Sequence, residues 1–258
     1  MIHPTAVIDS KAQIDENVEI GPYCTIDGPV KISSGTKLIS HVVVQGRTTI
    51  GINCTISPFA SLGGAPQDIT YKGEDTQVII GNNTKIMEYV TINRGTEHGG
   101  GTTKVGDRDF IMAYAHVAHD CVLGNDVILT NGATLGGHVE VADFATIAAL
   151  CAIHQFCRIG QYAFVSGMTG VPNDVPPFVM AAASSGIRAK LFGLNVVGLE
   201  RHGFTKEDIS KLKKAYKLLF RSALPLNTSL KIIQEEIQSE HIQTLIDFIK
   251  SSKRGICR

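Results

Sequence analysis

The sequence predicts a mainly β protein, in which a parallel β-helix of hexapeptide repeats is followed by a small α-helical C-terminal domain. Three observations predict this fold class. Aliphatic residues recur at every sixth position through most of the chain. A small or β-branched residue follows most of them four positions later. Beyond about residue 185 this pattern gives way to the spacing of amphipathic helices.

The six-residue repeat defines the β-helix. A period of six fits neither the 3.6 residues of a helical turn nor the alternation of a long strand, but short strands joined by sharp corners produce it, with three hexapeptide sides to each coil. Each aliphatic residue therefore points into a prism, and the residue four positions later must be small because it enters the same space. The aliphatic positions are Ile2, Ile8, Ile14, Ile20, Ile26, Ile32, Leu38, Val44, Ile50, Ile56, Leu62, then Ile80, Ile86, Ile92, then Val105, Ile111, Val117, Leu123, Leu129, Leu135, Val141, Ile147, Ile153, Ile159, Val165 and Val171.

The cysteines follow the same repeat. Five of the six occupy the small inward position, so we interpret them as buried small hydrophobic residues rather than metal ligands or redox groups. These five are Cys24, Cys54, Cys121, Cys151 and Cys157. Asp109 breaks the rule, because it places a carboxylate in the inward position.

Two interruptions of the repeat predict loops that leave the prism, at 63–79 and 93–104. We therefore expect a β-helix over 1–185 that carries these two loops, and a helical domain over 186–258. In the second domain, Thr205 and Asp208 resemble a capping box that starts a helix. Two further amphipathic stretches follow Pro225, and the helical domain is expected to cover one end of the coil stack.

Composition excludes some classes of function. The 24 basic and 24 acidic residues cancel, so the broad positive field of a nucleic-acid-binding protein is missing. The N-terminal residues lack the pattern of a signal peptide, and no stretch approaches the roughly 20 apolar residues that span a bilayer. We expect a cytoplasmic protein that binds no nucleic acid and is not stably inserted in a membrane.

Histidines gather at one corner of the predicted coils. Counting three hexapeptides to a coil places His119, His138 and His154 at nearly the same corner of successive coils, with Gly137 directly over His119. His116 lies on the preceding side of the same coil as His119. Three interpretations of this corner are open. In the first, the corner is polar only because it faces solvent. In the second, three histidines hold zinc, as in carbonic anhydrases of this repeat class, and in the third, one histidine is a general base oriented by Asp120.

A filled prism has no internal pocket, so a binding site needs a second wall outside it. Stacked coils leave flat faces with exposed apolar area, and three subunits around a common axis would form clefts between neighbours. The sequence therefore predicts a homotrimer with sites at the interfaces.

Six stretches carry a resemblance to a known family: "HVAHDC", "TLGGHVEV", "IHQFCRIG", "GLERHGFT", "GGAPQDITYKGE" and "VTINRGT". In their order, and over essentially the full length, the chain resembles the acyl-carrier-protein–UDP-N-acetylglucosamine O-acyltransferases, which start lipid A biosynthesis. The resemblance implies a left-handed β-helix, a homotrimer, no metal and no cofactor. It also implies transfer of an (R)-3-hydroxyacyl group from acyl carrier protein to the 3-hydroxyl of UDP-N-acetylglucosamine.

The resemblance also implies roles for individual residues. His119 would be the general base, Asp120 would hold its ring, and the backbone N–H of Gly137 would stabilise the oxyanion. Gly167 would lie at the end of the acyl groove and leave room for a longer chain. The substrate-binding positions implied are Asp68, His116, His138, His154, Gln155, Asn195 and Arg201.

Three positions depart from the family pattern, and these are Thr70, Val197 and His202, which stand where charged residues often help to bind the nucleotide. A lysine and arginine stripe, Lys213, Lys217 and Arg221, offers a surface for acidic acyl carrier protein. The alternative within the same pathway is an N-acyltransferase, which carries an additional N-terminal nucleotide-binding domain, whereas the repeat here begins at Ile2.

Overall fold

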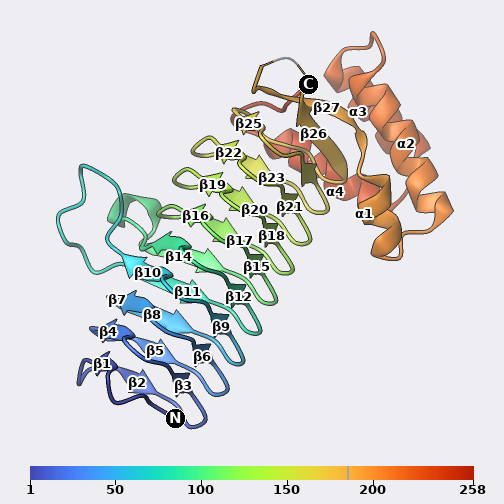
Figure 1. Cartoon of the computed structure of the whole chain (residues 1–258). Coiled ribbons are helices and arrows are strands. Elements are labelled where there is room, and N and C mark those ends of the chain that lie inside the picture. Colours follow the sequence, from blue (N-terminus) through green and yellow to red (C-terminus); the bar gives the residue numbers. More distant parts are fainter. Residues whose placement is uncertain (185) are drawn as a thin grey trace.

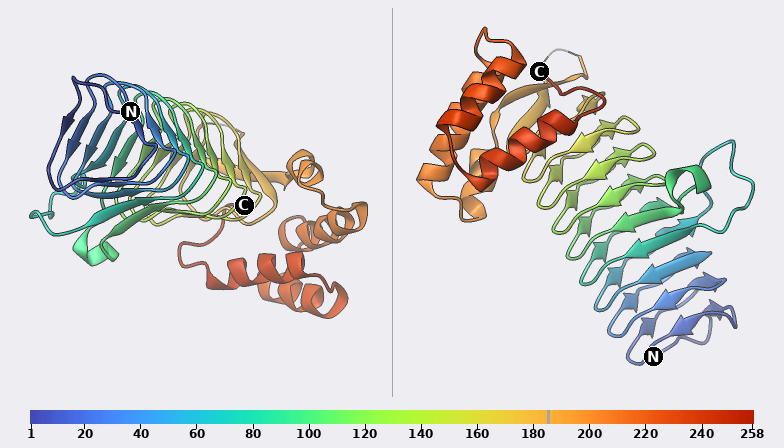
Figure 2. Two further views of the ribbon diagram at one scale, coloured as in Figure 1. Left: turned by 90° about the horizontal axis from the view of Figure 1, so that it is seen from below. Right: turned by 180° about the vertical axis from the view of Figure 1, so that it is seen from behind.

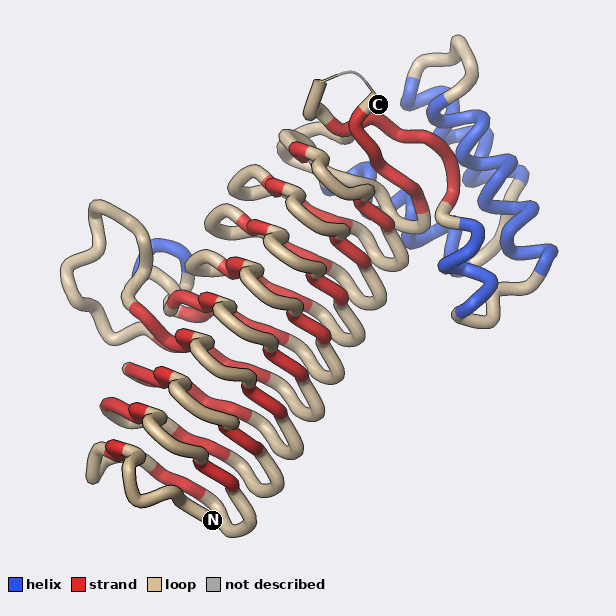
Figure 3. Tube along the Cα trace, viewed as in Figure 1, coloured by secondary structure: helices blue, strands red, loops and turns tan. Residues whose placement is uncertain are grey.

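A computed structural model describes residues 1–184 and 186–258. Most of the chain is a stack of coils with three strands to each coil, and each strand pairs in parallel with the strand of the next coil. The left view of Figure 2 shows the coils stacked one behind another, and Figure 3 shows how short the strands are between their turns. We call the three sheets the first, second and third face of the prism.

The strands have the following bounds. The first face holds β1 (Val7–Ile8), β4 (Thr25–Asp27), β7 (Val43–Gln45), β10 (Ser61–Gly64), β13 (Thr91–Asn93), β16 (His116–Val117), β19 (Thr134–Leu135), β22 (Ala152–Ile153) and β25 (Gly170–Val171). The second face holds β2 (Gln13–Ile14), β5 (Lys31–Ile32), β8 (Arg47–Ile50), β11 (Gln77–Ile80), β14 (Thr102–Val105), β17 (Val122–Leu123), β20 (Glu140–Val141) and β23 (Arg158–Ile159). The third face holds β3 (Glu19–Ile20), β6 (Lys37–Leu38), β9 (Thr55–Ile56), β12 (Lys85–Ile86), β15 (Phe110–Ile111), β18 (Ile128–Leu129), β21 (Thr146–Ile147), β24 (Phe164–Val165), β26 (Val179–Ala183) and β27 (Ala189–Leu194).

The core confirms the inward positions of the repeat. Ile111 and Ala115, an aliphatic residue and the small residue four positions later, are both fully buried. All six cysteines are free and buried, and burial raises the pKa of the Cys121 thiol to about 12. The first coil is the exception, since Ile2 is 50% exposed and Ile8 and Ile14 are only partly buried.

Asp109 fills its inward position with a satisfied carboxylate. Its Oδ1 atom accepts the N–H of Val127 at 2.8 Å and its Oδ2 atom accepts the N–H of Gly106 at 2.9 Å. The hydroxyl of Thr84 also accepts the Asp109 N–H. A polar group is tolerated here because it bonds backbone groups of its own coil and the next.

Two loops leave the prism on the same side, as Figure 1 shows. Residues 65–76 connect β10 to β11, and residues 94–101, with the short 3-10 helix Glu97–Gly99, connect β13 to β14. Residues 77–79 and 102–104, expected as loop, lie in β11 and β14. They extend as strands because Val78 and Thr103 are buried beneath the sheet while their neighbours face outward.

The coil stack ends in a hairpin and four helices. β26 pairs in parallel with β24, and β27 pairs antiparallel with β26. The helices are α1 (Val196–Arg201), α2 (Lys206–Phe220), α3 (Leu226–Glu236) and α4 (Glu240–Ser251). The boundary expected between 185 and 186 falls at residue 185, outside the described residues.

A local signal explains where α2 begins. α2 starts at the capping box of Thr205 and Asp208, as the sequence predicts, and its apolar face packs into a second core with α3 and α4. Neither α1 nor the hairpin was predicted, because both are too short to show a clear period. Among the described residues, no helix combines the length and the apolar composition that crossing a bilayer requires.

Candidate active site

A histidine and a carboxylate pair at the edge between the first and second faces. His119 and Asp120 form the turn from β16 to β17, and Asp120 has a φ of 61°, a left-handed conformation that aspartate tolerates at a tight corner. His119 Nδ1 lies 2.8 Å from Asp120 Oδ2. The His119 side chain keeps 13% of its surface exposed and that of Asp120 only 1%. The imidazole is thus oriented by a buried carboxylate and remains partly accessible to solvent.

Gly137 lies one coil above His119, as the coil count predicts. A Cβ atom at Gly137 would lie 2.6 Å from Cε1 of the His119 ring, so only glycine fits against this face of the imidazole. Among the described residues, no acceptor is paired with the Gly137 N–H. The edge therefore offers a basic nitrogen and a free backbone donor side by side.

His138 lies above Asp120 and stacks on an aromatic ring. Its Nε2 atom is 3.8 Å from Asp120 Oδ2, and its ring centroid is 5.1 Å from that of His119. Phe156, at the equivalent position of the next coil, stacks on His138 with centroids 4.4 Å apart. Burial lowers the pKa of His138, although the charge of Asp120 opposes this shift.

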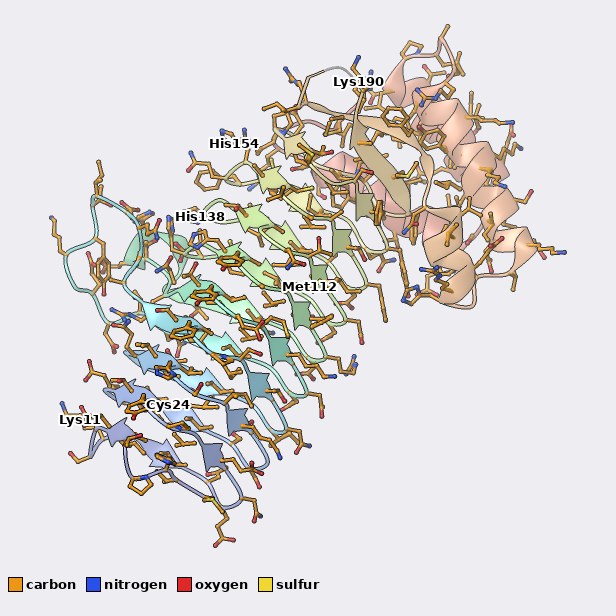
Figure 4. All side chains as sticks on the ribbon, viewed as in Figure 1. Lys11, Cys24, Met112, His138, His154 and Lys190 are labelled. Carbon is orange, nitrogen blue, oxygen red and sulfur yellow. The ribbon has the colours of Figure 1, made fainter. Side chains whose placement is uncertain are left out.

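His154 lies at the same corner of its coil, close to where the coil count places it, but it does not stack on His138. Phe156 does so, because residues stack when they are one full coil apart, and His154 precedes Phe156 by two positions. Figure 4 shows His154 above His138 along the coil stack. It is exposed and lines an apolar pocket of about 290 Å³ on the first face with Gly170, Val171 and Ile187. Its neighbour Gln155 stands one full coil after Gly137.

His116 projects from β16 on the first face, beside the edge. Its Nδ1 atom lies 2.7 Å from the Thr91 hydroxyl. Burial lowers the pKa of His116, so the ring is held largely in its neutral form at neutral pH. A neutral imidazole at this position can donate or accept a hydrogen bond to a ligand on the first face.

The first loop brings Asp68 to the same region. Its Oδ1 atom accepts both the N–H and the hydroxyl of Thr70, each at 2.8 Å, and these bonds lower the pKa of Asp68. Its Oδ2 atom lies 3.4 Å from Nε2 of His98 in the second loop. Thr70, a departure from the family pattern, therefore fixes the Asp68 carboxylate.

His98 is a further residue at this edge that the sequence did not predict. Its ring centroid lies 5.8 Å from that of His138, and its ring also faces the Thr96 hydroxyl at 3.3 Å. The signal that could have found it is the length of the second loop, which is long enough to fold back over the edge.

Asn195 and Arg201 lie elsewhere on the molecule. They line a groove of about 630 Å³ between α1 and the third face, together with Val197 and His202. The edge that carries His119 lies opposite the third face in a three-sided prism, so one chain does not bring these two groups together. Within the groove, Asn195 caps α1, since its Oδ1 atom accepts the N–H of Gly198, and its Nδ2 donates to the carbonyl of Tyr162.

Gly167 lies at the edge between the third and first faces and is exposed. A Cβ atom there would lie 3.3 Å from the Ala149 carbonyl oxygen, which is tight but not blocked. The cationic stripe of Lys213, Lys217 and Arg221 is exposed along α2 and its C-cap. Arg221 also donates to the carbonyl of Leu191 and to the Tyr216 hydroxyl, which fixes its guanidinium.

One group of side chains could hold a metal ion. Donor atoms of His119, Asp120 and His138 all lie within 4.8 Å of one another among the described residues. However, Asp120 Oδ2 already accepts the Thr96 hydroxyl at 2.6 Å and faces His119 Nδ1. An ion shared by this oxygen and His119 Nδ1 would have to displace the hydrogen bond between them. The donor set therefore suits an oriented histidine better than a zinc ion.

The fold and this edge define a transferase of the hexapeptide-repeat class. A model of bacterial transferase hexapeptide repeats matches residues 102–137, the part of the coil stack that contains His116, His119 and Asp120. A second model, the second domain of UDP-N-acetylglucosamine O-acyltransferase, matches residues 174–257.

Full-length relatives identify the family. The chain is 58% identical to acyl-acyl-carrier-protein–UDP-N-acetylglucosamine O-acyltransferase of Thermodesulfovibrio yellowstonii and 45% identical to the enzyme of that name from Syntrophobacter fumaroxidans, each over 100% of this chain and 99% of the relative. The chain therefore belongs to the family of acyl-carrier-protein–UDP-N-acetylglucosamine O-acyltransferases.

Solved structures agree with this family. The UDP-N-acetylglucosamine acyltransferase of Francisella novicida gives a TM-score of 0.96 at 40% identity, over 100% of this chain and 94% of that chain. The Acinetobacter baumannii protein LpxA gives 0.95 at 43% identity, over 100% and 99%. The predicted fold class, a left-handed parallel β-helix with an α-helical C-terminal part, is confirmed.

Proposed function

We propose that this protein transfers an (R)-3-hydroxyacyl group from acyl carrier protein to the 3-hydroxyl of UDP-N-acetylglucosamine, the first step of lipid A biosynthesis. The names of its full-length relatives support both substrates. The observation that carries the proposal is the edge where His119, Asp120 and Gly137 meet. It supplies a base and an oxyanion donor, the two groups that acyl transfer from a thioester requires.

The reaction follows from the positions of these groups. His119 Nε2 takes the proton of the sugar 3-hydroxyl while that oxygen attacks the thioester carbonyl carbon. The carbonyl oxygen gains negative charge, which the Gly137 N–H stabilises. When the tetrahedral intermediate collapses, the carbon–sulfur bond breaks and the carrier thiolate takes the proton from His119. Asp120 keeps the ring oriented through both transfers, and no metal or cofactor takes part in this scheme.

Substrate contacts extend from this edge along the first face. Asp68, held by Thr70, would bind the sugar, and His116 and His138 would line its position. His154 and Gln155 would contact the sugar nucleotide or the acyl chain. The apolar pocket beside His154 supports an acyl path on this face. At Gly167 the open edge leaves room for a long chain, so Gly167→Met should shift donor preference to shorter chains.

The positions of the two residues that we propose to bind the nucleotide support a homotrimer. Asn195 and Arg201 lie on the opposite side of the prism from His119, so they can serve the same site only if they come from an adjacent subunit. An exposed aromatic ladder along the third–first edge also favours burial by a neighbour. Its rings are those of Tyr23, His41, Phe59, Tyr89 and Tyr114, with successive centroids 4.9 to 5.0 Å apart.

Three further proposals concern the domain bounds, the surface for acyl carrier protein and the cellular compartment. The chain divides at residue 185 into a β-helix that carries loops at 65–76 and 94–101 and a C-terminal part over 186–258 that begins with β27 and is otherwise helical. Lys213 and Lys217 on α2 offer positive charge to acidic acyl carrier protein. We place the reaction in the cytoplasm.

A direct assay tests the function. The purified protein is incubated with UDP-N-acetylglucosamine and a panel of 3-hydroxyacyl carrier proteins, and the products are analysed by mass spectrometry. We expect a mono-O-acylated sugar nucleotide whose formation a metal chelator does not affect. An N-acylated product, or loss of activity with chelator and recovery with zinc, would contradict the proposal.

A further inference from the structure

Thr96 in the second loop holds the carboxylate of Asp120 from the side opposite His119. The Thr96 N–H donates to Asp120 Oδ1 at 2.8 Å, and its hydroxyl donates to Asp120 Oδ2 at 2.6 Å. Both residues are buried, since Thr96 has 2% and Asp120 has 6% of its surface exposed. Charge-assisted hydrogen bonds in such an environment are strong and well directed.

The hydroxyl of Thr96 fixes the position of the Asp120 oxygen that accepts a hydrogen bond from His119. Oδ2 is the oxygen that faces both the Thr96 hydroxyl and His119 Nδ1. A carboxylate only accepts hydrogen bonds, so the proton between Oδ2 and the ring must lie on Nδ1. This tautomer leaves Nε2 unprotonated. The position of Oδ2 therefore sets both the angle of the ring and its tautomer.

The loop packs closely enough that this position cannot relax. A Cβ atom at Gly99 would lie 2.1 Å from Asp120 Cγ, so the backbone of the loop touches the carboxylate directly. The Gly99 N–H in turn donates to a lone pair of the Thr96 hydroxyl at 3.1 Å, and the single proton of that hydroxyl is donated to Asp120. The backbone N–H of Asp120 is fixed separately by the hydroxyl of Thr103 at 2.8 Å.

The same hydroxyl also connects the two loops. His98 Nε2 lies 3.3 Å from the Thr96 hydroxyl and 3.4 Å from Asp68 Oδ2. A row of contacts thus leads from the first loop to His119.

We infer that Thr96 is a positioning residue for the reaction, which acts through Asp120 to hold His119 in the orientation and tautomer that a general base needs. This inference rests on the proposed function. The Thr96 methyl group has no part in it, because every contact described above is made by the hydroxyl or the backbone. Serine should therefore replace threonine, whereas isosteric valine should not.

The test compares Thr96→Val, Thr96→Ser and Thr102→Val in the full-length protein. Thr102 is a matched control, because its hydroxyl accepts from Gln77 at 3.0 Å and does not contact Asp120. For Thr96→Val we expect kcat to fall by about 10- to 100-fold, less than the loss of a general base itself, with the KM for UDP-N-acetylglucosamine nearly unchanged. Thr96→Ser should restore most of the rate, and Thr102→Val should behave as wild type.

A spectroscopic measurement separates this inference from the proposed function. In protein labelled with ¹⁵N-histidine, the hydrogen-bonded Nδ1 proton of His119 should give a downfield signal that weakens in Thr96→Val and returns in Thr96→Ser. If the wild type shows this signal but transfers no acyl group, the proposed function fails and the positioning contact stands. A Thr96→Val variant with wild-type kcat and an unchanged signal, or a loss that serine does not restore, would overturn the inference.

Discussion

His119 Nδ1 and Asp120 Oδ2 lie 2.8 Å apart, and the carboxylate is almost fully removed from solvent. Since Asp120 is also bonded by Thr96, its oxygens have little freedom to turn away from the ring. The imidazole therefore keeps Nε2 free of Asp120, while the backbone of Gly137 in the next coil lies against the face of the ring. The predictions below depend on this arrangement.

Asp120→Asn should keep the shape of the site and lose its chemistry. Asparagine tolerates the left-handed corner at this position, so the variant should fold. Its amide can donate a proton to Nδ1, which would favour the wrong tautomer of His119. We expect kcat to fall by about 10⁴-fold, as for the corresponding change in a serine protease triad. A steady-state assay that finds less than a tenfold loss would argue against an orienting role for Asp120.

Gly137→Ala should displace the base. The added methyl group would meet the His119 ring at 2.6 Å, closer than non-bonded atoms approach. We expect kcat to fall by about 100-fold or more, because the ring must move and the oxyanion donor moves with it. Thermal denaturation should show that the variant still folds. A folded variant with wild-type kcat would show that Gly137 has no part in catalysis.

The β-helix could be predicted from the sequence because its repeat places every residue by arithmetic. Gly137 falls over His119 at a separation of one full coil, and the structure confirms it. The same count places His154 at this corner but two positions before the residue that stacks on His138, and Phe156 makes that contact.

The loops could not be predicted in this way. Thr96 and His98 reach the site because the second loop folds back over the coil edge. The six-residue repeat does not predict the conformation of this loop. The position of Arg201 opposite His119 is likewise a property of the whole prism, since α1 packs against the third face. Only the resemblance to a family suggested a role for that residue.

Stability should depend on pH through Asp109. Burial raises the pKa of Asp109 from 3.8 to about 7, although the hydrogen bonds from two backbone N–H groups act to lower it. Between about pH 4 and pH 7 the folded protein therefore binds a proton that the unfolded chain has lost. Stability present at pH 4 should fall as the pH rises to 7, by up to about 4 kcal/mol.

Asp109→Asn isolates this effect, because asparagine does not titrate. The variant should be less stable than wild type at pH 5, since one buried N–H loses its acceptor, at a cost of about 1 to 3 kcal/mol. Its melting temperature should change less between pH 5 and pH 8 than that of wild type. Parallel pH dependence of the two proteins, followed by circular dichroism, would exclude Asp109 as the titrating group.

Mixed trimers test whether each site is shared between subunits. His119→Ala and Arg201→Ala should each lose most activity alone. In a cyclic trimer that contains both variants, one of three sites combines an intact His119 with an intact Arg201. A random equal mixture, refolded or co-expressed, should then recover about a quarter of wild-type activity. No recovery in verified mixed trimers would mean that both residues serve a site within one subunit.

The central claim is that His119 is the general base, and the rate of His119→Ala tests it most directly. The variant is compared with wild type and with His3→Ala, a change at an exposed histidine far from the site. Initial rates of acyl transfer are measured on protein of confirmed fold and oligomeric state. We expect His119→Ala to be slower by about 10²- to 10⁴-fold and His3→Ala to match wild type. A His119→Ala rate within about threefold of wild type would contradict the claim, since a general base contributes about 10²-fold at least.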